Sequence, residues 1–595
     1  MFCAIVIIVE LLRGNGWGSA LIAGVSLAIA AVPEEFPMVY TLYLALGAWR
    51  LSRDRALVRR LPGVETLGST TVICTDKTGT LTFGRLDVAA TAFASSIDEK
   101  ELLQAAVFAC EPDPYDPLDV AIVGYARTRG VAVDELLSNQ LVVDHPFDPV
   151  DKYLTHVWKL ADGQVVVAAK GAVEGILAHA LLPDPLREAA LAENAAFANA
   201  GMRVIAVASG EHNARNGDDR SAHEADLRYL GLIAFSDAVR PGVAEALAEC
   251  RSAGIRVVMI TGDHPVTAHA IAEGLDLPHT AGDGEDVIAT GSDLDAANDA
   301  EFDRLVARAN VFARIRPEQK HRLVSALRKQ GEVVAMTGDG INDAPALREA
   351  DIGVAMGARG TAVARESATM VLLDDNFATI VTAVRDGRRI FDNLQRAFAY
   401  LVGFHVPLLV AAIVVPFLGK PLLLLPVHLV LLEIVLHPAV SLVFEADPAA
   451  PDTMRRPPRS RATGFVTRAL WRPLLLGSTL TAATLGTYLV ASSRQWGDEQ
   501  ARGSAFSLLL IGQMLLLLVE RSPDRPLWRG PRPTRTLLWV VALFAATIVA
   551  FTYISPLADL LRIEPPSPLA WLSLVALAAG STLWSEPIKR PLAPR

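Results

Sequence analysis

The sequence has few cysteines, and their spacing shows no pairs. Four occur among 595 residues: Cys3, Cys74, Cys110 and Cys250. This pattern excludes a disulfide framework and fits a protein whose thiols stay reduced in the cytoplasm. The first residues also lack a basic segment and a small-residue cleavage site, so we do not expect a secretory signal peptide.

Charged residues are scarce over several long stretches. The mean hydropathy is +0.33 and 51% of residues are hydrophobic, which is too apolar for a wholly soluble enzyme. Residues 1–12 are apolar but too short to cross a bilayer alone, and 505–519 is the shortest of the longer stretches. Stretches of about the length of a membrane span lie at 19–49, 400–418, 421–444, 470–491, 505–519, 536–553 and 568–584.

Arginine is unevenly distributed between the loops. Five arginines follow the first full span, at Arg50, Arg53, Arg55, Arg59 and Arg60, whereas the alternate loops carry few basic residues. The positive-inside rule therefore places the arginine-rich loops, and the large polar region 50–390, in the cytoplasm, so we expect a multi-pass protein of the cytoplasmic membrane. The net charge of −10 says little about partners, and we expect no nucleic acid among them. The other arginine-rich loops are 455–468 and 521–535, and the alternate loops are 13–18, 419–420, 492–504 and 554–567.

A β-branched apolar run at 70–76 ends on one acidic residue, Asp76. A short loop containing Gly79 follows, so the run predicts a strand with a carboxylate exposed at its C-terminal end. In an open α/β sheet this edge is where ligands bind. An aspartate there can act as a nucleophile toward a phosphoryl group and form an acyl-phosphate.

Two later segments, 256–263 and 332–343, are again apolar strands that end in Thr-Gly-Asp. Three parallel strands would bring Asp76, Asp263 and Asp339 to one sheet edge. A carboxylate cluster of this kind suits Mg²⁺ held against a phosphate, because a hard cation prefers oxygen ligands. The chain between Asp76 and Asp263 is long enough for a separate inserted domain.

The heptad Asp76-Lys77-Thr78-Gly79-Thr80-Leu81-Thr82 resembles the phosphorylation signature of P-type ATPases. The resemblance implies that ATP is the substrate, that Asp76 takes its γ-phosphoryl group, and that Asp76, Thr78 and Asp339 hold Mg²⁺. In Arg316-Pro317-Glu318-Gln319-Lys320, the lysine matches the one that neutralises the transferring phosphoryl charge. The residues matched to catalytic positions of the family are Asp76, Lys77, Thr78, Thr261, Gly262, Asp263, Lys320, Asn342 and Asp343.

A soluble phosphatase of the same haloacid-dehalogenase-like fold is an alternative. Such phosphatases typically carry a second aspartate two residues after the nucleophile, where this chain has Thr78. Without that acid–base group a phosphoenzyme would persist, which suits a pump that changes shape before hydrolysis.

The expected fold class is a multidomain α/β protein with an all-α membrane domain. Its phosphorylation domain is Rossmann-like and carries an inserted α+β nucleotide-binding domain. The expected boundaries are 1–49 for the first membrane helices, 50–84 and 233–390 for the phosphorylation domain, 85–232 for the nucleotide-binding domain, and 391–595 for about six further membrane helices.

Several short patterns in the inserted region resemble the nucleotide site of the family. They include Asp119 before an apolar helix, Phe147 with Lys152 five residues on, Lys170-Gly171-Ala172 after the strand 164–169, and Arg203 at the strand 203–208. An aromatic ring can stack on adenine, and basic side chains can meet phosphates. The family's usual Phe-x-x-x-Arg-Lys pattern has Asp151 in the arginine position. The residues that the resemblance assigns to ATP are Asp119, Phe147, Lys152, Lys170, Gly171, Arg203 and Arg314.

The first full span contains Pro33-Glu34-Glu35-Phe36-Pro37. Two prolines four residues apart predict a break in the helix, because each removes an N–H and clashes one turn back. Two carboxylates in such a break favour an intramembrane cation site, and the alternative is a kink with both glutamates protonated. The motif resembles the Pro-Glu-Gly-Leu-Pro of calcium-type pumps, with Glu35 in place of glycine.

Later spans supply His405, Glu433 and His437, the last two expected one helical turn apart on one face. Together with Glu34 and Glu35 they form the predicted site for the transported cation. This set is poor in hard oxygen ligands for Ca²⁺, and imidazoles suit a transition metal or a proton relay better. No Cys-Pro-Cys occurs in a span, which argues against the heavy-metal branch of the family.

The family's actuator segment, which bears Thr-Gly-Glu, has no counterpart before the first span. The sequence therefore resembles the C-terminal two-thirds of a calcium-type pump, and we expect ATP-driven cation transport. The alternative is an actuator-less remnant, or a split pump whose actuator is separately encoded, that binds ATP and autophosphorylates. Lipid transport is a weaker alternative, because flippases of the superfamily lack a glutamate pair in the broken helix.

Overall fold

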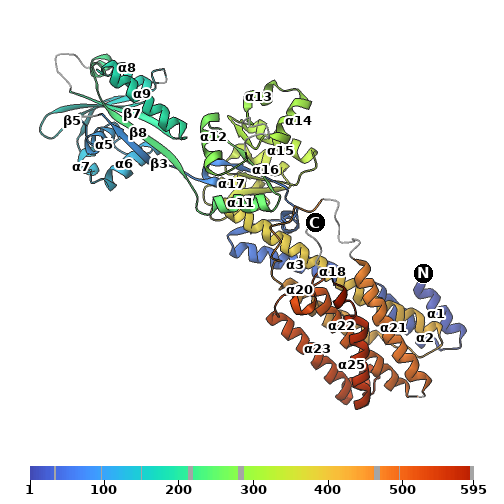
Figure 1. Ribbon diagram of the computed structural model, residues 1–595. Coiled ribbons are helices and arrows are strands. Elements are labelled where there is room, and N and C mark those ends of the chain that lie inside the picture. The colour runs from blue at the N-terminus through green and yellow to red at the C-terminus, as the bar shows by residue number, and fades with distance from the viewer. Residues whose placement is uncertain are drawn as a thin grey trace. The chain divides into compact units, whose positions relative to one another are not determined.

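The structure is a computed structural model of the chain (Figure 1). It describes residues 1–32, 35–94, 97–148, 150–211, 219–278, 287–460, 470–494 and 496–589. The chain divides into two compact units. The membrane unit comprises Met1–Ser69, Ser252–Gly254 and Thr382–Arg595, and the second unit comprises Thr70–Arg251 and Ile255–Val381.

The second unit contains a parallel sheet with β2 (Val72–Asp76) near its centre. On either side of β2 lie β12 (Val334–Gly338) and β9 (Arg256–Ile260), and Cys74 pairs with Met336 on one strand and with Val258 on the other. The three strands predicted to end in aspartates are therefore adjacent and parallel. The remaining strands of this unit's part of the sheet are β14 (Met370–Leu372) and β13 (Ile352–Met356) beyond β12, and β11 (Val311–Ala313) and β10 (Ile288–Thr290) beyond β9.

Helices pack on this parallel sheet because its strands are apolar on both faces. Val72, Cys74, Val258 and Ile260 point into one core, where they meet Leu323 and other side chains. A fully apolar strand needs cover on both sides, which is why the strands show no polar alternation. The helices of this region are α11 (Val243–Ser252), α12 (Pro265–Gly274), α13 (Gly291–Ala296), α14 (Asp299–Arg308), α15 (Pro317–Lys329), α16 (Ala344–Glu349) and α17 (Ala362–Ser367).

The insertion is a six-stranded antiparallel sheet with helices on both faces (Figure 1). Its strands alternate between two cores: Ile205 and Val207 pack with the helices α5, α6 and α7, whereas Ala206 and Ala208 pack on the side of α8 and α9. The strand order is β3 (Thr82–Phe93), β8 (Arg228–Val239), β7 (Arg203–Glu211), β6 (Val165–Gly171), β5 (Tyr153–Lys159) and β4 (Gln140–His145). The helices are α5 (Glu99–Phe108), α6 (Pro117–Thr128), α7 (Val133–Leu137), α8 (Val173–His179) and α9 (Asp184–Asn199), with a short α10 (Arg220–His223).

These two sheets confirm the expected fold class of an α/β phosphorylation domain with an α+β insertion. The antiparallel sheet extends beyond the expected limits of 85 and 232, since β3 begins at Thr82 and β8 ends at Val239.

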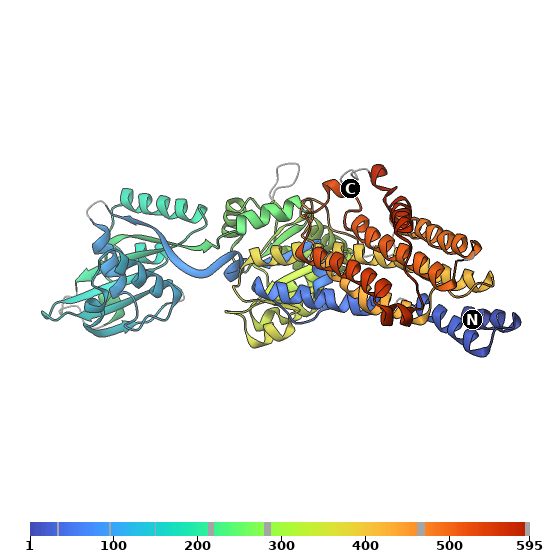
Figure 2. The ribbon, with the colours of Figure 1, turned by 90° about the horizontal axis from the view of Figure 1, so that it is seen from below.

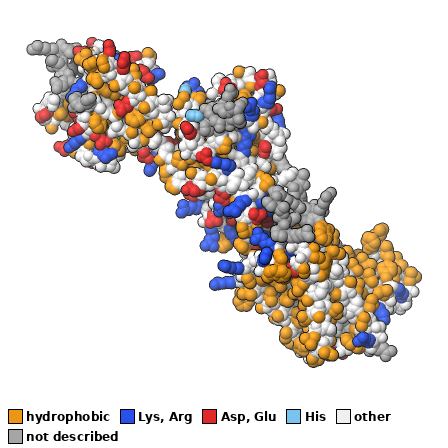
Figure 3. All heavy atoms as spheres, viewed as in Figure 1, with side chains coloured by type: hydrophobic (Ala, Val, Ile, Leu, Met, Phe, Trp, Pro, Cys, Tyr) orange, Lys and Arg blue, Asp and Glu red, His pale blue; other side chains and the backbone are white. Residues whose placement is uncertain are grey.

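The membrane unit is largely helical, and apolar side chains cover much of the face seen in Figure 3. Among the described residues, seven helical segments are long and apolar enough to cross a membrane, in agreement with the seven predicted stretches. They are Trp17–Arg53, which includes α2 (Trp17–Ala31) and α3 (Glu35–Arg53), then Phe377–Phe417 (α18), Pro426–Glu445, Trp471–Ser493 (α21), Asp498–Arg521 (α22), Arg535–Tyr553 (α23) and Pro568–Ile588, which includes α25 (Pro568–Leu583). The shorter elements are α1 (Phe2–Leu12), α4 (Pro62–Leu67), α19 (Pro426–Val430), α20 (His437–Glu445) and α24 (Ser555–Leu561), with the strand β1 at Ala56–Val58.

The stretch 505–519 is a full-length helix, contrary to its short hydropathy signal. Helix α22 has 24 residues and is the most buried span, with 83% of its central window inside the protein. Arg502, Ser504, Ser507 and Gln513 are buried in it, and these polar side chains lower the local hydropathy. Burial against other helices therefore lets this span carry polar residues.

The helix break predicted at the two prolines is present. Helix α2 (Trp17–Ala31) is followed by Val32, which has extended backbone angles, and α3 (Glu35–Arg53) begins three residues after Val32. Pro37 lies in the first turn of α3, where its missing N–H costs no helical hydrogen bond. Helix α3 runs alongside α18 (Figures 1 and 2), and the rings of Phe36 and Phe398 meet edge to face at 5.1 Å.

Candidate active site and membrane site

The C-terminal edge of the parallel sheet brings the predicted aspartates together. Asp76 is the last residue of β2, Asp263 follows β9, and Asp339 directly follows β12. The turn Lys77–Leu81 returns the chain tightly, with Gly79 at φ +78, a conformation that L side chains rarely adopt. The side chain of Asp76 is therefore presented at the edge rather than buried in a helix.

Lys320, on α15, joins two of these carboxylates. Its Nζ donates to Asp76 Oδ2 at 2.7 Å and to Asp343 Oδ1 at 2.9 Å. Burial alone would lower the pKa of Lys320, but the negative charges of Asp76 and Asp343 outweigh it and raise that pKa. The lysine is therefore a fixed positive charge beside the candidate nucleophile.

Lys77, Thr261 and Asp263 form a second polar group at the same edge. Lys77 Nζ lies 2.6 Å from Asp263 Oδ2, and the Asp263 amide donates to Thr261 Oγ1 at 3.1 Å. Thr78 donates its amide to Asp76 Oδ1 at 3.4 Å. Gly262 and Asn342, also predicted here, are exposed.

Asp339 and Asp343 occupy one loop after β12. Asp343 Oδ2 accepts the amides of Asp339 and Gly340 at 3.2 and 3.1 Å, so the loop is closed on itself. Burial and the nearby charge of Asp76 raise the pKa of Asp339. Carboxylate oxygens gathered at one sheet edge are the donor set that Mg²⁺ prefers.

Four residues at this edge have no counterpart among the sequence predictions. The Asp76 amide donates to Thr337 Oγ1 at 2.9 Å, and Arg359 lies 3.6 Å from Asp339 Oδ2.

Asp237 accepts from the Thr82 hydroxyl at 2.5 Å and from the Gly84 amide at 2.8 Å, while Arg240 donates to the carbonyls of Thr82 and Gly79. Asp237 and Arg240 thus tie the end of β8 to the start of β3. For Thr337, Asp237 and Arg240 the only indication in the sequence was a polar residue at the end of an apolar strand. Arg359 had no such indication.

In the six-stranded sheet, the structure pairs two of the predicted nucleotide residues. Lys170 on β6 forms a buried ion pair with Asp119 on α6, and its Nζ also lies 3.4 Å from Cys110 Sγ. The Lys152 carbonyl accepts the amide of Ala172, which places Lys152 beside the Lys170-Gly171-Ala172 segment.

The other predicted nucleotide residues are exposed. Phe147 is 57% exposed, a position open to a stacking base. Arg203 and Arg314 are exposed too, and Arg314 adopts a left-handed conformation with its amide bonded to the Asp263 carbonyl.

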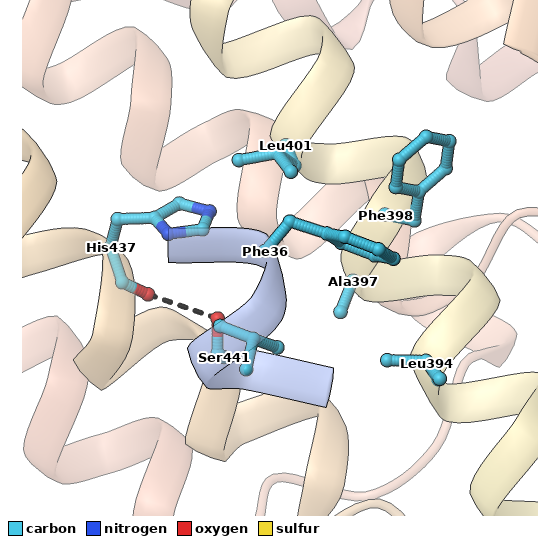
Figure 4. A pocket seen from close by; sticks show the side chains of 8 residues that line it. Phe36, Leu394, Ala397, Phe398, Leu401, His437 and Ser441 are labelled. Atoms are coloured by element: carbon cyan, nitrogen blue, oxygen red, sulfur yellow. Dashed lines mark hydrogen bonds between the residues drawn. The ribbon is translucent and has the colours of Figure 1, made fainter. Parts of the chain in front are cut away.

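The predicted cation ligands of the membrane unit are only partly within the described residues. Glu34 lies outside them, and the side chain of Glu35 is not described. His405, Glu433 and His437 are in the membrane unit, and the rings of His405 and His437 are 6.4 Å apart. His437 is 2% exposed and lines a small pocket with Phe36, Ser441 and apolar residues of α18 (Figure 4).

The helix between Glu433 and His437 departs from the predicted regular turn. Residues Leu431–Leu436 form a π-helical segment, and α20 begins at His437. A π-helical turn is wider than an α-helical turn, so a four-residue spacing no longer stacks two side chains directly. Neither ring nitrogen of His437 has a hydrogen-bond partner among the described residues.

Comparison with known proteins agrees with this geometry. A family model for haloacid dehalogenase-like hydrolases matches residues 70–351, and one for the C-terminus of cation transporting ATPases matches residues 421–590. A calcium-transporting ATPase of Bacillus subtilis is 32% identical over 98% of this chain and 71% of its own length. The chain belongs to the P-type cation-transporting ATPases.

Two other relatives of this P-type ATPase match a similar share of this chain and of their own length. A protein named Probable cation-transporting ATPase F from Mycobacterium tuberculosis is 35% identical over 97% of this chain and 69% of its own length. A calcium-transporting ATPase 1 of Schizosaccharomyces pombe is 32% identical over 99% of this chain and 69% of its own length. The protein is thus a multi-pass membrane ATPase with soluble domains that drives cation transport.

Proposed function

We propose that this ATPase transports its cation through an aspartyl-phosphate formed on Asp76. The observation that carries the proposal is the Lys320 contact: a buried ammonium lies 2.7 Å from Asp76 Oδ2 at the edge of the central strand. A carboxylate held by a fixed cation is oriented for attack. The surrounding Asp339 and Asp343 make the same edge suitable for a phosphoryl group with its metal.

The first step is an in-line phosphoryl transfer. A carboxylate oxygen of Asp76 attacks the γ-phosphorus of ATP, the bond from that phosphorus to the bridging oxygen breaks, and ADP leaves with the bridging oxygen. Lys320 and Lys77 provide positive charge beside the transferring group. Mg²⁺ would be held by Asp76, Asp339 and an oxygen of Thr78, and when bound it would neutralise charge on the phosphoryl oxygens.

Several residues of the six-stranded sheet support the binding of ATP. The exposed ring of Phe147 offers a stacking surface, and Lys170, at the end of β6, carries a buried ammonium. Lys170 is already paired with Asp119, so we expect the triphosphate to compete with Asp119 for the lysine. We therefore assign ATP to these residues.

The transported cation is assigned to the membrane unit. Glu433 is buried within the π-helical segment, His437 is buried just after it, and His405 lies near His437. The names of the relatives make Ca²⁺ the first ion to test. The imidazoles favour a transition metal, since borderline-soft ions bind nitrogen donors well. Stimulation of ATPase activity by a panel of cations decides between them.

The proposal is tested with Asp76→Asn, which preserves shape and removes the nucleophile. Membranes that contain the wild-type chain should form an acid-stable phosphoprotein from γ-labelled ATP, and the Asp76→Asn membranes should form none. Asp299→Asn is a matched control, because Asp299 is a fully exposed aspartate at the first turn of α14. A hydroxylamine-sensitive label retained on Asp76→Asn would refute the proposal.

A further inference from the structure

A third group of polar side chains lies on the six-stranded sheet, outside the residues assigned above. Glu111, Asp144 and His156 each place one ligand atom within 4.8 Å of the other two. Asp144 on β4 and His156 on β5 are direct partners in the antiparallel ladder, so their side chains lie on one face. Glu111 joins them from the loop that follows α5.

The imidazole of His156 is held in a defined orientation. Its side chain is 1% exposed, and Nδ1 lies 3.1 Å from the carbonyl oxygen of Cys110. A carbonyl oxygen can only accept, so Nδ1 carries a hydrogen, and Nε2 is the ring nitrogen left to bind a metal. A backbone carbonyl on the far nitrogen is the usual support of a metal-binding histidine.

Nε2 of His156 faces two carboxylates. Nε2 lies 3.3 Å from Asp144 Oδ1 and 4.0 Å from Glu111 Oε1, and it has no hydrogen-bond partner among the described residues. A buried polar atom without a partner is costly, and anionic oxygens beside it add repulsion. A cation between the three atoms relieves both.

The spacing suits a metal ion. Bonds of about 2.1 Å place two tetrahedral ligands about 3.4 Å apart, close to the His156–Asp144 separation. The carboxylate side chains are 35% and 45% exposed at Glu111 and Asp144, so they can close on an ion and leave room for water ligands. One nitrogen and two oxygen donors suit a divalent transition metal better than Ca²⁺ or Mg²⁺, which prefer oxygen alone.

We propose that Glu111, Asp144 and His156 bind a divalent transition-metal ion, for which Zn²⁺ is the probe. The site shares the Cys110–Glu111 segment with the Lys170 pair. The Glu111 amide donates to Asp119 Oδ2 at 3.1 Å, and the Cys110 carbonyl orients His156. A bound ion therefore immobilises the segment that holds Asp119. This coupling rests on the proposed role of Lys170 and Asp119 in ATP binding, whereas metal binding itself does not.

The site is tested by equilibrium dialysis of the full chain in detergent with radioactive Zn²⁺ and excess Mg²⁺. Asp144→Asn and Glu111→Gln, both changes at partly exposed side chains, should each bind one Zn²⁺ fewer per chain than wild type. Asp144→His, which keeps a ligand atom, should retain that ion. Asp162→Asn is the control, because Asp162 is an exposed aspartate in the turn between β5 and β6.

Equal Zn²⁺ binding by all of these proteins would overturn the site and leave an ion pair of protonated His156 with its carboxylates. The coupling has its own measurement, the dissociation constant of the fluorescent analogue TNP-ATP. Saturating Zn²⁺ should tighten it several-fold in wild type and leave Asp144→Asn unchanged. A lack of any zinc effect in wild type would overturn the coupling while dialysis still decides the site.

Discussion

The cluster around Asp76 and the buried polar residues of the membrane unit both keep polar groups away from water, but by different means. At Asp76 the protein supplies its own counter-charge, because Lys320 contacts two carboxylates and Lys77 contacts a third. In the membrane unit, His437 is buried with both ring nitrogens unbonded among the described residues. At the first site, lysine ammonium groups offset carboxylate charges before a ligand binds. At the second site, the unbonded ring nitrogens of His437 can bind a cation.

The largest expected effect comes from removing the counter-charge of the first site. In Lys320→Met, Asp76 and Asp343 lose their shared cation, and the phosphoryl group loses a fixed positive charge. We expect the rate of phosphoenzyme formation to fall by about 10³-fold. Rapid-quench labelling with ATP measures this rate.

Lys329→Met is the control for that experiment, since Lys329 is an exposed lysine at the end of the same helix. A phosphorylation rate in Lys320→Met within a factor of two of the control would mean that phosphoryl transfer to Asp76 does not depend on the charge of this lysine.

A smaller effect is expected in the membrane unit, where one donor of several is removed. Glu433→Gln keeps the shape of the side chain and removes its charge. We expect the cation concentration for half-maximal ATPase stimulation to rise about ten-fold, because a neutral amide is a weaker cation ligand than a carboxylate. Cation titrations of ATPase activity measure it.

The matched variant is Glu564→Gln, an exposed glutamate between α24 and α25. If Glu433→Gln and Glu564→Gln gave the same titration curve, the cation would not be bound at Glu433, and the contrast between the two sites would lose its basis.

The smallest expected effect concerns the carboxylates that Lys320 does not neutralise. The pKa of Asp339 is raised by burial and by Asp76, so its ionised form destabilises the folded state in the absence of Mg²⁺. Asp339→Asn should therefore raise the Tm by about 2 °C at pH 7 in EDTA. This gain should shrink as the pH falls through the pKa of Asp339, because the wild-type carboxyl then becomes neutral as well.

Thermal unfolding followed by tryptophan fluorescence at pH 7 and at acidic pH measures the gain, with Asp299→Asn as the exposed control. A lower Tm for Asp339→Asn at pH 7 would show that the ionised Asp339 carboxylate does not destabilise the folded state.

Much of the candidate active site could be predicted because short motifs end apolar strands. The heptad after β2 and the Thr-Gly-Asp segments place Asp76, Asp263 and Asp339 by strand direction alone, and parallel pairing then brings them to one edge. Lys320 lies far along the chain, and its contact with Asp76 depends on how α15 packs. Thr337 is the threonine of the second Thr-Gly-Asp segment, but its contact with Asp76 was not predicted. Asp237, Arg240 and Arg359 were missed because no local motif contains them.

By itself, the sequence determined the P-type family, the parallel strands that end in aspartates, the seven spans and the break before α3. Each follows from local periodicity, from the position of prolines or from a contiguous motif. Only the tertiary structure decided that Lys320 bridges Asp76 and Asp343, that Glu433 lies in a π-helical segment that ends just before His437, and that Glu111 joins Asp144 and His156. These arrangements depend on packing and strand register between distant segments, which no local stretch of sequence encodes.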